Sequence, residues 1–231
     1  MDSYAILYED EDILVANKLS PMPVQPEKSG DRSLQDALRE DLADRAGLVA
    51  GGPLLEAAHR IDRRASGAVA FAKTHIALST LEAAFRAKRV EKSYLACVER
   101  EPEPRIGRLE HNLAWDKRRN VVRALPAGSA SGKGAVLEYE LVGRSDRYFF
   151  VAVRLETGRH HQIRAQLAAI GCPIRGDLKY GARRSSPSGL IMLHARKIIL
   201  DQPRTDERLE ILAPFPEAEP LWAAYAEPEP S

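Results

Sequence analysis

Short apolar runs separated by charged turns dominate the chain and predict more strands than helices. Tyr4–Tyr8 and Ile13–Ala16 are strand-like, and the acidic turn Glu9–Asp12 between them predicts a hairpin. The run from Val90 to Val98 is apolar on both faces, which is typical of an interior strand. Similar runs predict further strands at residues 68–72, 135–142, 148–155 and 190–200, with a turn at 143–147.

Fewer segments show helical spacing. Ser33 begins a capping pattern, and the leucines that follow at intervals of four predict a helix that stops near Gly47. Further helices are predicted at residues 75–87, at 159–170 with a stop at Gly171, and at 221–225. Because strands dominate without regular strand–helix alternation, the expected fold class is α+β on a mixed sheet.

Two segments are predicted to lack regular structure. Pro21–Pro26 has too many prolines for a helix or a central strand. The tail at 226–231 is acidic and contains proline, so we expect it to be disordered.

Composition limits the class of protein. The 231 residues are 44% hydrophobic and 29% charged, as in ordinary globular proteins of one large or two small domains. No apolar run approaches the roughly 18 residues that span a bilayer, and the N-terminus does not resemble a signal peptide. Cys97 and Cys172 are far apart and lack ligand spacing, so reduced thiols and a cytoplasmic location are expected.

The net charge of +1 conceals an uneven distribution. Residues 57–200 contain 27 Lys and Arg against 13 Asp and Glu, whereas residues 1–56 contain 5 against 12 and residues 201–231 contain 2 against 8. A basic middle between acidic ends favours a surface that binds a polyanion. The alternative is a set of solvated surfaces that differ in the sign of their charge and bind nothing.

The segment from His59 to Gly67 holds the most informative carboxylate. Asp62 lies among Arg60, Arg63 and Arg64, with apolar residues before and after the segment. An ionised Asp in this setting suits chemistry on a nucleic acid. An acidic residue in a solvated basic turn is the plain alternative, and both interpretations stay open on this segment alone.

Other chemistries find little support. Residues 128–134 are one residue short of the phosphate-binding motif, and Gly134 stands where that motif needs a magnesium-binding hydroxyl. We therefore expect an ordinary flexible loop there that does not bind phosphate. His160 and His161 are neighbours that diverge by about 100° on a helix, and no other residues add zinc spacing, so no metal is expected. Nucleophile-elbow and dinucleotide-binding patterns are also lacking.

Two further residues raise a structural question. Arg164 lies beside the apolar stripe of the helix predicted at 159–170, where a guanidinium needs a carboxylate partner. Tyr94 lies on the interior strand, where spacing alone favours a core residue.

Five ordered segments resemble the RluA-type pseudouridine synthases and cover residues 6–216. They are residues 8–18, His59–Asp62 with Ser66–Gly67, Glu91–Ala96, Gly158–Arg164 running on to Asp177 and Gly181, and Leu193–Ala195. The resemblance implies one catalytic domain at 1–225 with a pseudouridine synthase fold, a mixed and largely antiparallel sheet flanked by helices and loops. We expect no accessory N-terminal RNA-binding domain.

The resemblance implies that the protein isomerises uridine to pseudouridine in a structured rRNA or tRNA. This reaction oxidises nothing and adds no atom, so no cofactor or metal is expected. We also expect a monomer that does not bind a membrane. By this resemblance Asp62 is the catalytic carboxylate, Tyr94 packs against the uracil, Arg164 pairs with Asp62, and Arg60 helps to extrude the base. The other substrate-binding positions that it implies are Ile61, Arg63, Arg159, His161, Gln162 and Leu193.

The pattern has departures. Ala65 and His160 stand where the family usually has Thr, Ile61 replaces Leu, and Lys18–Pro21 lacks the usual Lys-Pro-x-Gly. None removes a catalytic group that the resemblance implies. Two alternatives remain: a non-catalytic RNA-binding factor, and a hydrolase that uses Asp62, although the latter lacks an evident second carboxylate.

Overall fold

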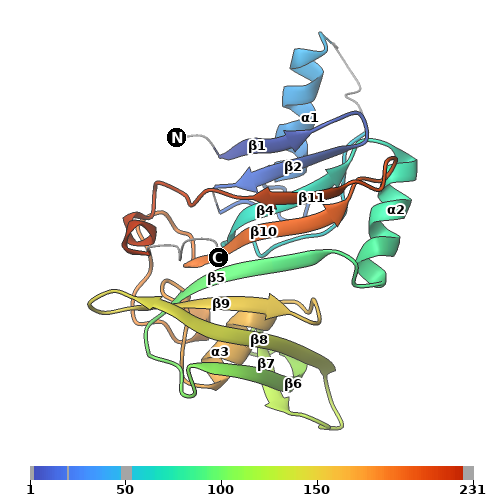
Figure 1. Ribbon diagram of the computed structural model, residues 1–231. Coiled ribbons are helices and arrows are strands. Elements are labelled where there is room, and N and C mark those ends of the chain that lie inside the picture. Colours follow the sequence, from blue (N-terminus) through green and yellow to red (C-terminus); the bar gives the residue numbers. More distant parts are fainter. Residues whose placement is uncertain (1–2, 20, 48–53, 226–231) are drawn as a thin grey trace. The chain divides into compact units, whose positions relative to one another are not determined.

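The computed structural model describes residues 3–19, 21–47 and 54–225 (Figure 1). The acidic tail at 226–231 therefore lies outside the described residues. The chain divides into two compact units. Unit 1 comprises Met1–Lys92 and Ala195–Pro214, and unit 2 comprises Ser93–His194 and Phe215–Ser231.

Unit 1 is a sheet with two helices. Its strands follow the order β1-β2-β4-β10, with β3 paired to β4 and β11 paired to β10. Their bounds are β1 (Tyr4–Glu9), β2 (Ile13–Lys18), β3 (Glu56–Ala57), β4 (Ser66–Ala72), β10 (Leu193–Asp201, in unit 1 from Ala195) and β11 (Arg208–Leu212). The helices are α1 (Leu34–Arg45) and α2 (His75–Arg86).

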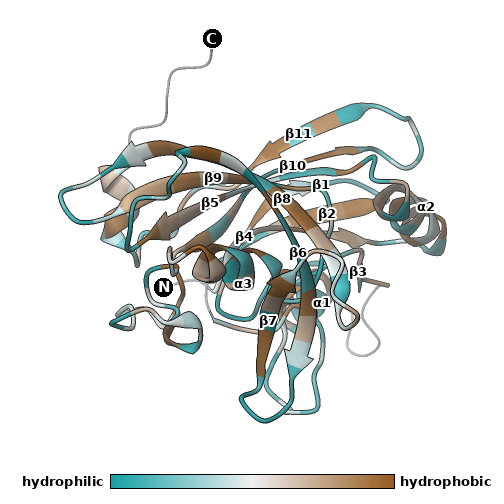
Figure 2. Ribbon diagram, turned by 90° about the horizontal axis from the view of Figure 1, so that it is seen from below, coloured by the Kyte–Doolittle hydropathy of each residue, from teal (hydrophilic) through white to brown (hydrophobic). Residues whose placement is uncertain are grey.

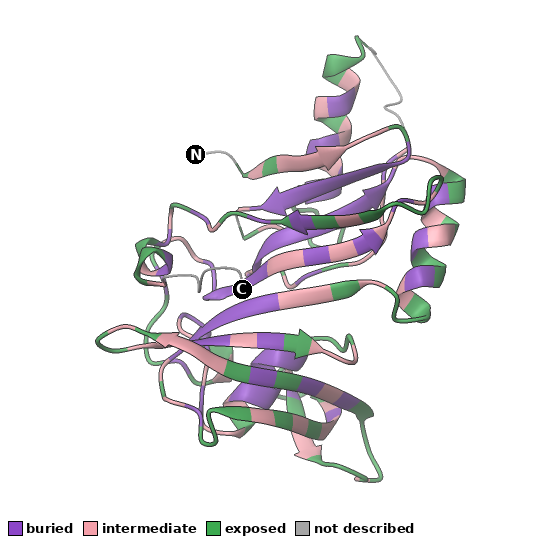
Figure 3. Ribbon diagram, in the orientation of Figure 1, coloured by how far each residue is buried: buried purple, intermediate pink, exposed green. Residues whose placement is uncertain are grey.

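Hydrophobic burial explains why β2 and β4 lie inside this sheet. Every residue of both strands is buried, as their purple colour in Figure 3 shows. Ile13 and Val15 of β2 pack with Ala70 of β4 and with Leu81 of α2 in one hydrophobic cluster. Strands covered on both faces favour continuous apolar runs, which these segments have.

Unit 2 is an antiparallel sheet in the order β5-β9-β8-β6-β7. Its strands are β5 (Glu91–Val98, in unit 2 from Ser93), β6 (Ile106–Asp116), β7 (Val121–Pro126), β8 (Lys133–Arg144) and β9 (Phe149–Leu155). The α-helix is α3 (Gln162–Ala169), and the 3-10 helices are η1 (Leu178–Tyr180) and η2 (Pro220–Ala224). Leu113, Val122 and Ala135 pack with Ala165 of α3 in a small cluster.

Much of the predicted secondary structure is confirmed. The fold is α+β, and all the strand pairs named above with a defined register are antiparallel. The first two strands form the predicted hairpin. Ser33 starts α1 with a complete capping box, in which its hydroxyl accepts from the Asp36 N–H and the Asp36 carboxylate accepts from the Ser33 N–H.

Three predictions were wrong in part. α3 begins at Gln162 rather than Arg159, because His161 has a left-handed backbone (φ 53°) that a right-handed helix cannot include. The strand predicted from Leu190 begins at Leu193. The strands β3, β6, β7 and β11 were not predicted at all. β3 has only two residues, and polar and charged residues interrupt the apolar positions of the other three.

The two cysteines match the expectation from composition, since Cys97 and Cys172 are buried free thiols. Among the described residues, none of the helices is long and apolar enough to cross a membrane.

Candidate active site

The turn that carries Asp62 lies in unit 1 just before β4. The Ala65 N–H donates to the Asp62 carbonyl at 3.0 Å, which closes the turn. Ile61 and Ala65 are buried beneath it, whereas Asp62 is half-buried and Arg60 is exposed. The turn therefore presents its carboxylate and an arginine while its apolar side chains face the core.

Arg63 is exposed on the same turn and interacts with the loop that precedes α1. Its Nη1 donates to Asp31 Oδ2 at 2.8 Å, and this bond lowers the pKa of Asp31. Both side chains are about half exposed, so water and salt screen the pair strongly. Arg63 can therefore exchange Asp31 for another anion at little cost.

Lys18 is the most unusual residue of this turn's surroundings. It ends β2, it is fully buried, and its Nζ donates to the Arg63 carbonyl at 2.8 Å. Burial lowers the pKa of Lys18 to about 7, while the nearby charge of Asp62 acts in the opposite direction. A buried lysine thus supports the turn from beneath and lies within the electrostatic reach of Asp62.

His59 and Gly67 fix the two ends of the turn. His59 Nε2 accepts from the Ala70 N–H at 3.0 Å, and burial together with Lys92 lowers the His59 pKa to about 3. The ring is therefore neutral, with its proton on Nδ1, and it serves as a structural acceptor. At Gly67 (φ +114°) an added Cβ would lie 2.4 Å from the Ala195 oxygen, so only glycine allows this close approach of β4 to β10.

In unit 2, Arg164 of α3 forms a buried ion pair. Its Nε and Nη2 donate to the two carboxylate oxygens of Asp177 at 2.6 and 2.8 Å, and its guanidinium lies 4.8 Å from the Tyr180 ring centre. Arg164 is 5% exposed and Asp177 is fully buried. The prediction that Arg164 needs a carboxylate is consistent with this pair, and the pair uses only two of the five N–H donors. The expected pairing of Arg164 with Asp62 stays a prediction.

The loop before α3 is fixed by Gln162. Its Oε1 accepts from the Thr157 hydroxyl and the Arg159 N–H, both at 2.9 Å, and its Nε2 donates to the Val136 carbonyl at 3.0 Å. Arg159 Nε donates to the Gly134 carbonyl at 3.1 Å while the side chain remains exposed. Gln162 thus orients the loop, and its direct contact with substrate stays a prediction.

His161 is the residue with backbone strain in this loop. It has a left-handed conformation, and its Nδ1 lies 2.8 Å from the Tyr180 hydroxyl. The same hydroxyl accepts from the Val122 N–H of β7. Tyr180, itself bonded to β7, thus holds His161 in a conformation that non-glycine residues rarely adopt, and such strain often marks a functional position.

Tyr94 and Leu193 are both buried in unit 2. Tyr94 is 6% exposed on β5, opposite Val153 of β9, and Leu193 is 3% exposed at the start of β10. Burial of Tyr94 suits the core interpretation and equally a closed pocket for a base. Its expected packing against the uracil stays a prediction.

Sequence reasoning missed three residues around these groups: Lys18 as the buried support of the Asp62 turn, and Asp177 and Tyr180 as the partners of Arg164. All three lie within the segments quoted for the resemblance. The sequence held a signal for Asp177, because a guanidinium on an apolar helix face needs a nearby carboxylate when it is buried.

Comparison with known proteins identifies the class of this fold and site. Residues 12–169 match a family model described as RNA pseudouridylate synthase, and this stretch contains Asp62, Tyr94 and Arg164. The uncharacterized RNA pseudouridine synthase YlyB of Bacillus subtilis (strain 168) is 34% identical over 213 residues, which cover 92% of this chain and 69% of that protein. The ribosomal large subunit pseudouridine synthase D of Pseudomonas aeruginosa is 34% identical over 234 residues, with 94% and 69% covered.

A solved structure agrees with these relatives. The human RNA pseudouridylate synthase domain containing 1 superposes with a TM-score of 0.75 at 25% identity, covering 91% of this chain and 83% of that chain. The chain therefore belongs to the RNA pseudouridylate synthase family, whose members are isomerases that convert uridine in RNA to pseudouridine.

Proposed function

We propose that this protein isomerises a specific uridine in rRNA or tRNA to pseudouridine, with Asp62 as the catalytic carboxylate. The observation that carries the proposal is the half-buried Asp62 on a turn fixed by Lys18 and Gly67, inside the stretch that matches the family. The ribosomal large subunit relatives support rRNA as the substrate class. We further propose that both units together form the catalytic domain of residues 1–225, acting as a cytoplasmic monomer.

The reaction needs a carboxylate, a base pocket and a cation. It breaks the bond between C1′ of the sugar and N1 of uracil, turns the base, and joins C5 to C1′. N1 gains a proton and C5 loses one to water, so no net oxidation occurs. In this proposal Asp62 acts on the target nucleotide, Tyr94 packs against the uracil, and Arg164 favours the ionised form of Asp62.

Extruding the target base from the RNA costs free energy that contacts with the protein must offset. Removing a uridine from its stack costs a few kcal/mol, and an aromatic face recovers about 1–3 kcal/mol. We propose that exposed Arg60 takes the place of the extruded base and that Arg63 and Arg159 contact phosphates. Ile61, His161, Gln162 and Leu193 complete the proposed substrate contacts.

Tritium release tests this function directly. RNA labelled with tritium at C5 of uracil should release label to water with the wild-type protein, and Asp62→Ala should lower the rate at least about 100-fold. Asp44→Ala is the matched control, because Asp44 is an exposed carboxylate of α1. Equal release by wild type and Asp62→Ala would contradict the role of Asp62, and free uracil in place of pseudouridine would indicate a hydrolase.

A further inference from the structure

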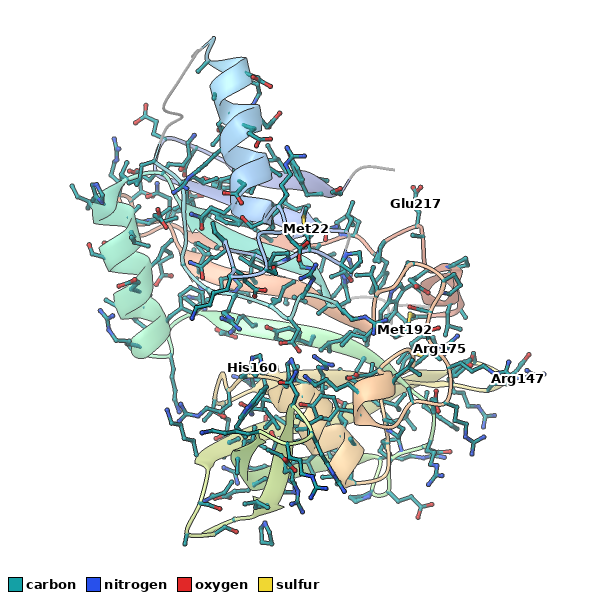
Figure 4. The ribbon with its side chains drawn as sticks, turned by 180° about the vertical axis from the view of Figure 1, so that it is seen from behind. Met22, Arg147, His160, Arg175, Met192 and Glu217 are labelled. Carbon is teal, nitrogen blue, oxygen red and sulfur yellow. The ribbon has the colours of Figure 1, made fainter. Side chains whose placement is uncertain are left out.

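Unit 2 carries a row of rings that runs from the buried Arg164 pair to the surface. The Tyr180 ring lies 5.5 Å from His161 at 83°, His161 stacks on His160 at 3.9 Å and 22°, and His160 lies 5.6 Å from Trp115. We call Trp115, His160, His161 and Tyr180 the aromatic row. His160, labelled in Figure 4, comes from the loop before α3, and Trp115 comes from β6.

Trp115 is exposed where a core residue would be expected. Side chains alternate along a strand, so Trp115 shares a face with Leu113, which is buried in the cluster under α3. Trp115 nevertheless remains 47% exposed, whereas Trp222 is 3% exposed. The exposed indole leaves an aromatic face that a ligand can cover.

The surroundings of Trp115 are strongly basic. The turn between β6 and β7 contains Lys117, Arg118 and Arg119, all exposed, and Lys179 Nζ lies 5.6 Å from the Trp115 ring centre. Among the described residues, Lys117, Arg118 and Arg119 form no ion pair, whereas Arg108 of the same sheet pairs with two glutamates. The hydrophilic end of this hairpin is teal in Figure 2. The positive charge here is therefore available to a ligand.

Aromatic rings beside uncompensated cations favour one class of ligand. Single-stranded nucleic acids bind by stacking bases on aromatic side chains while basic residues contact the backbone. An acidic protein would use the charges but would gain little from the indole and imidazole faces.

We propose that Trp115 and His160 form a stacking platform for an unpaired base of the RNA substrate, and that Lys117, Arg118 and Arg119 contact its phosphates. This inference rests on the proposed function and names a specificity element for it. Trp115 stands at the opposite end of the row from Arg164, and we assign the base that stacks there to a nucleotide flanking the target uridine. Substrates with an unpaired flanking nucleotide are therefore preferred over continuous duplex RNA.

Intrinsic fluorescence tests the stacking directly. The protein has two tryptophans, so Trp222→Phe leaves Trp115 as the sole indole, and Phe conserves the ring that packs on Phe215. A 12-nucleotide oligouridylate should quench this fluorescence to saturation. Heparin, a polyanion without bases, and duplex RNA should quench it weakly. Equal quenching by heparin and oligouridylate would overturn the proposal, because charge alone would then explain binding.

Kinetics supply the second test. Trp115→Ala should raise KM for RNA by about 5- to 100-fold and leave kcat within about twofold. Ile106→Ala is the matched control, because Ile106 is an exposed apolar residue (66%) of the same strand and should change neither value. Replacing Lys117, Arg118 and Arg119 by Ala should reduce the slope of log affinity against log salt by about 2. An unchanged KM for Trp115→Ala would overturn the proposal.

The proposed function can fail independently of this inference. Asp62→Ala retains the aromatic row, so adding it to Trp222→Phe should leave the quenching by oligouridylate unchanged even though tritium release falls at least about 100-fold. Saturable quenching of Trp222→Phe by oligouridylate, together with a wild type that forms no pseudouridine, would contradict the proposed function. Tritium release without such quenching would contradict the platform.

Discussion

Replacing Lys18 by Met tests whether an ionisable lysine is buried beneath the turn that carries Asp62. Lys18 is fully buried, and burial lowers its pKa from 10.5 to about 7 despite the opposing effect of Asp62. Because the folded-state pKa is the lower one, the unfolded chain binds more protons between pH 7 and pH 10.5. The contribution of Lys18 to the free energy of unfolding therefore rises with pH through this window.

The magnitude follows from the pKa difference. One pKa unit corresponds to about 1.4 kcal/mol, so burying Lys18 lowers the free energy of unfolding by about 4 kcal/mol at pH 7 and by about 2 kcal/mol at pH 9. Met has a similar volume and no charge, and it loses the bond from Nζ to the Arg63 carbonyl, which contributes about 1 kcal/mol at either pH. Lys18→Met should therefore be about 3 kcal/mol more stable than wild type at pH 7, and this advantage should shrink by about 2 kcal/mol at pH 9.

Urea denaturation followed by circular dichroism at about pH 6, 7, 8 and 9 measures both proteins under the same conditions. The difference between them isolates Lys18, because all other titrating groups are common to both. Lys28→Met, at an exposed position, should show no such pH dependence. A difference between Lys18→Met and wild type that stays constant from about pH 7 to pH 9 would refute the reasoning.

Two further predictions concern the packing of the site. Gly67→Ala should lower the free energy of unfolding by at least about 3 kcal/mol, because its Cβ would lie 2.4 Å from the Ala195 oxygen at a φ of +114°. Gly134→Ala is the control, because nothing lies within 4 Å of a Cβ added there. In the same urea denaturation assay its free energy of unfolding should stay within about 0.5 kcal/mol of wild type. Asp177→Asn should cost about 3 kcal/mol and slow tritium release, because it removes the charge that accepts two bonds from buried Arg164. Wild-type thermal stability and release rate in Asp177→Asn would show that the ion pair is dispensable.

Local sequence patterns were sufficient for the elements whose cause is local. The capping box at Ser33 determines where α1 starts, and the apolar runs of β2 and β4 predict interior strands without reference to any distant segment. The failures have a tertiary cause. α3 starts three residues late because the His161–Tyr180 contact and the Gln162 bonds hold the preceding loop outside the helix.

The sequence by itself determined the α+β class, the segment around Asp62 and the need of Arg164 for a carboxylate. Only the tertiary structure decided that Asp177 forms an ion pair with Arg164, that Lys18 is buried under the Asp62 turn, and that Trp115 is exposed. The physical reason is that propensity and capping act within one turn or strand. Burial, desolvation and ring stacking depend on which distant segments share a neighbourhood, and the fold alone sets that.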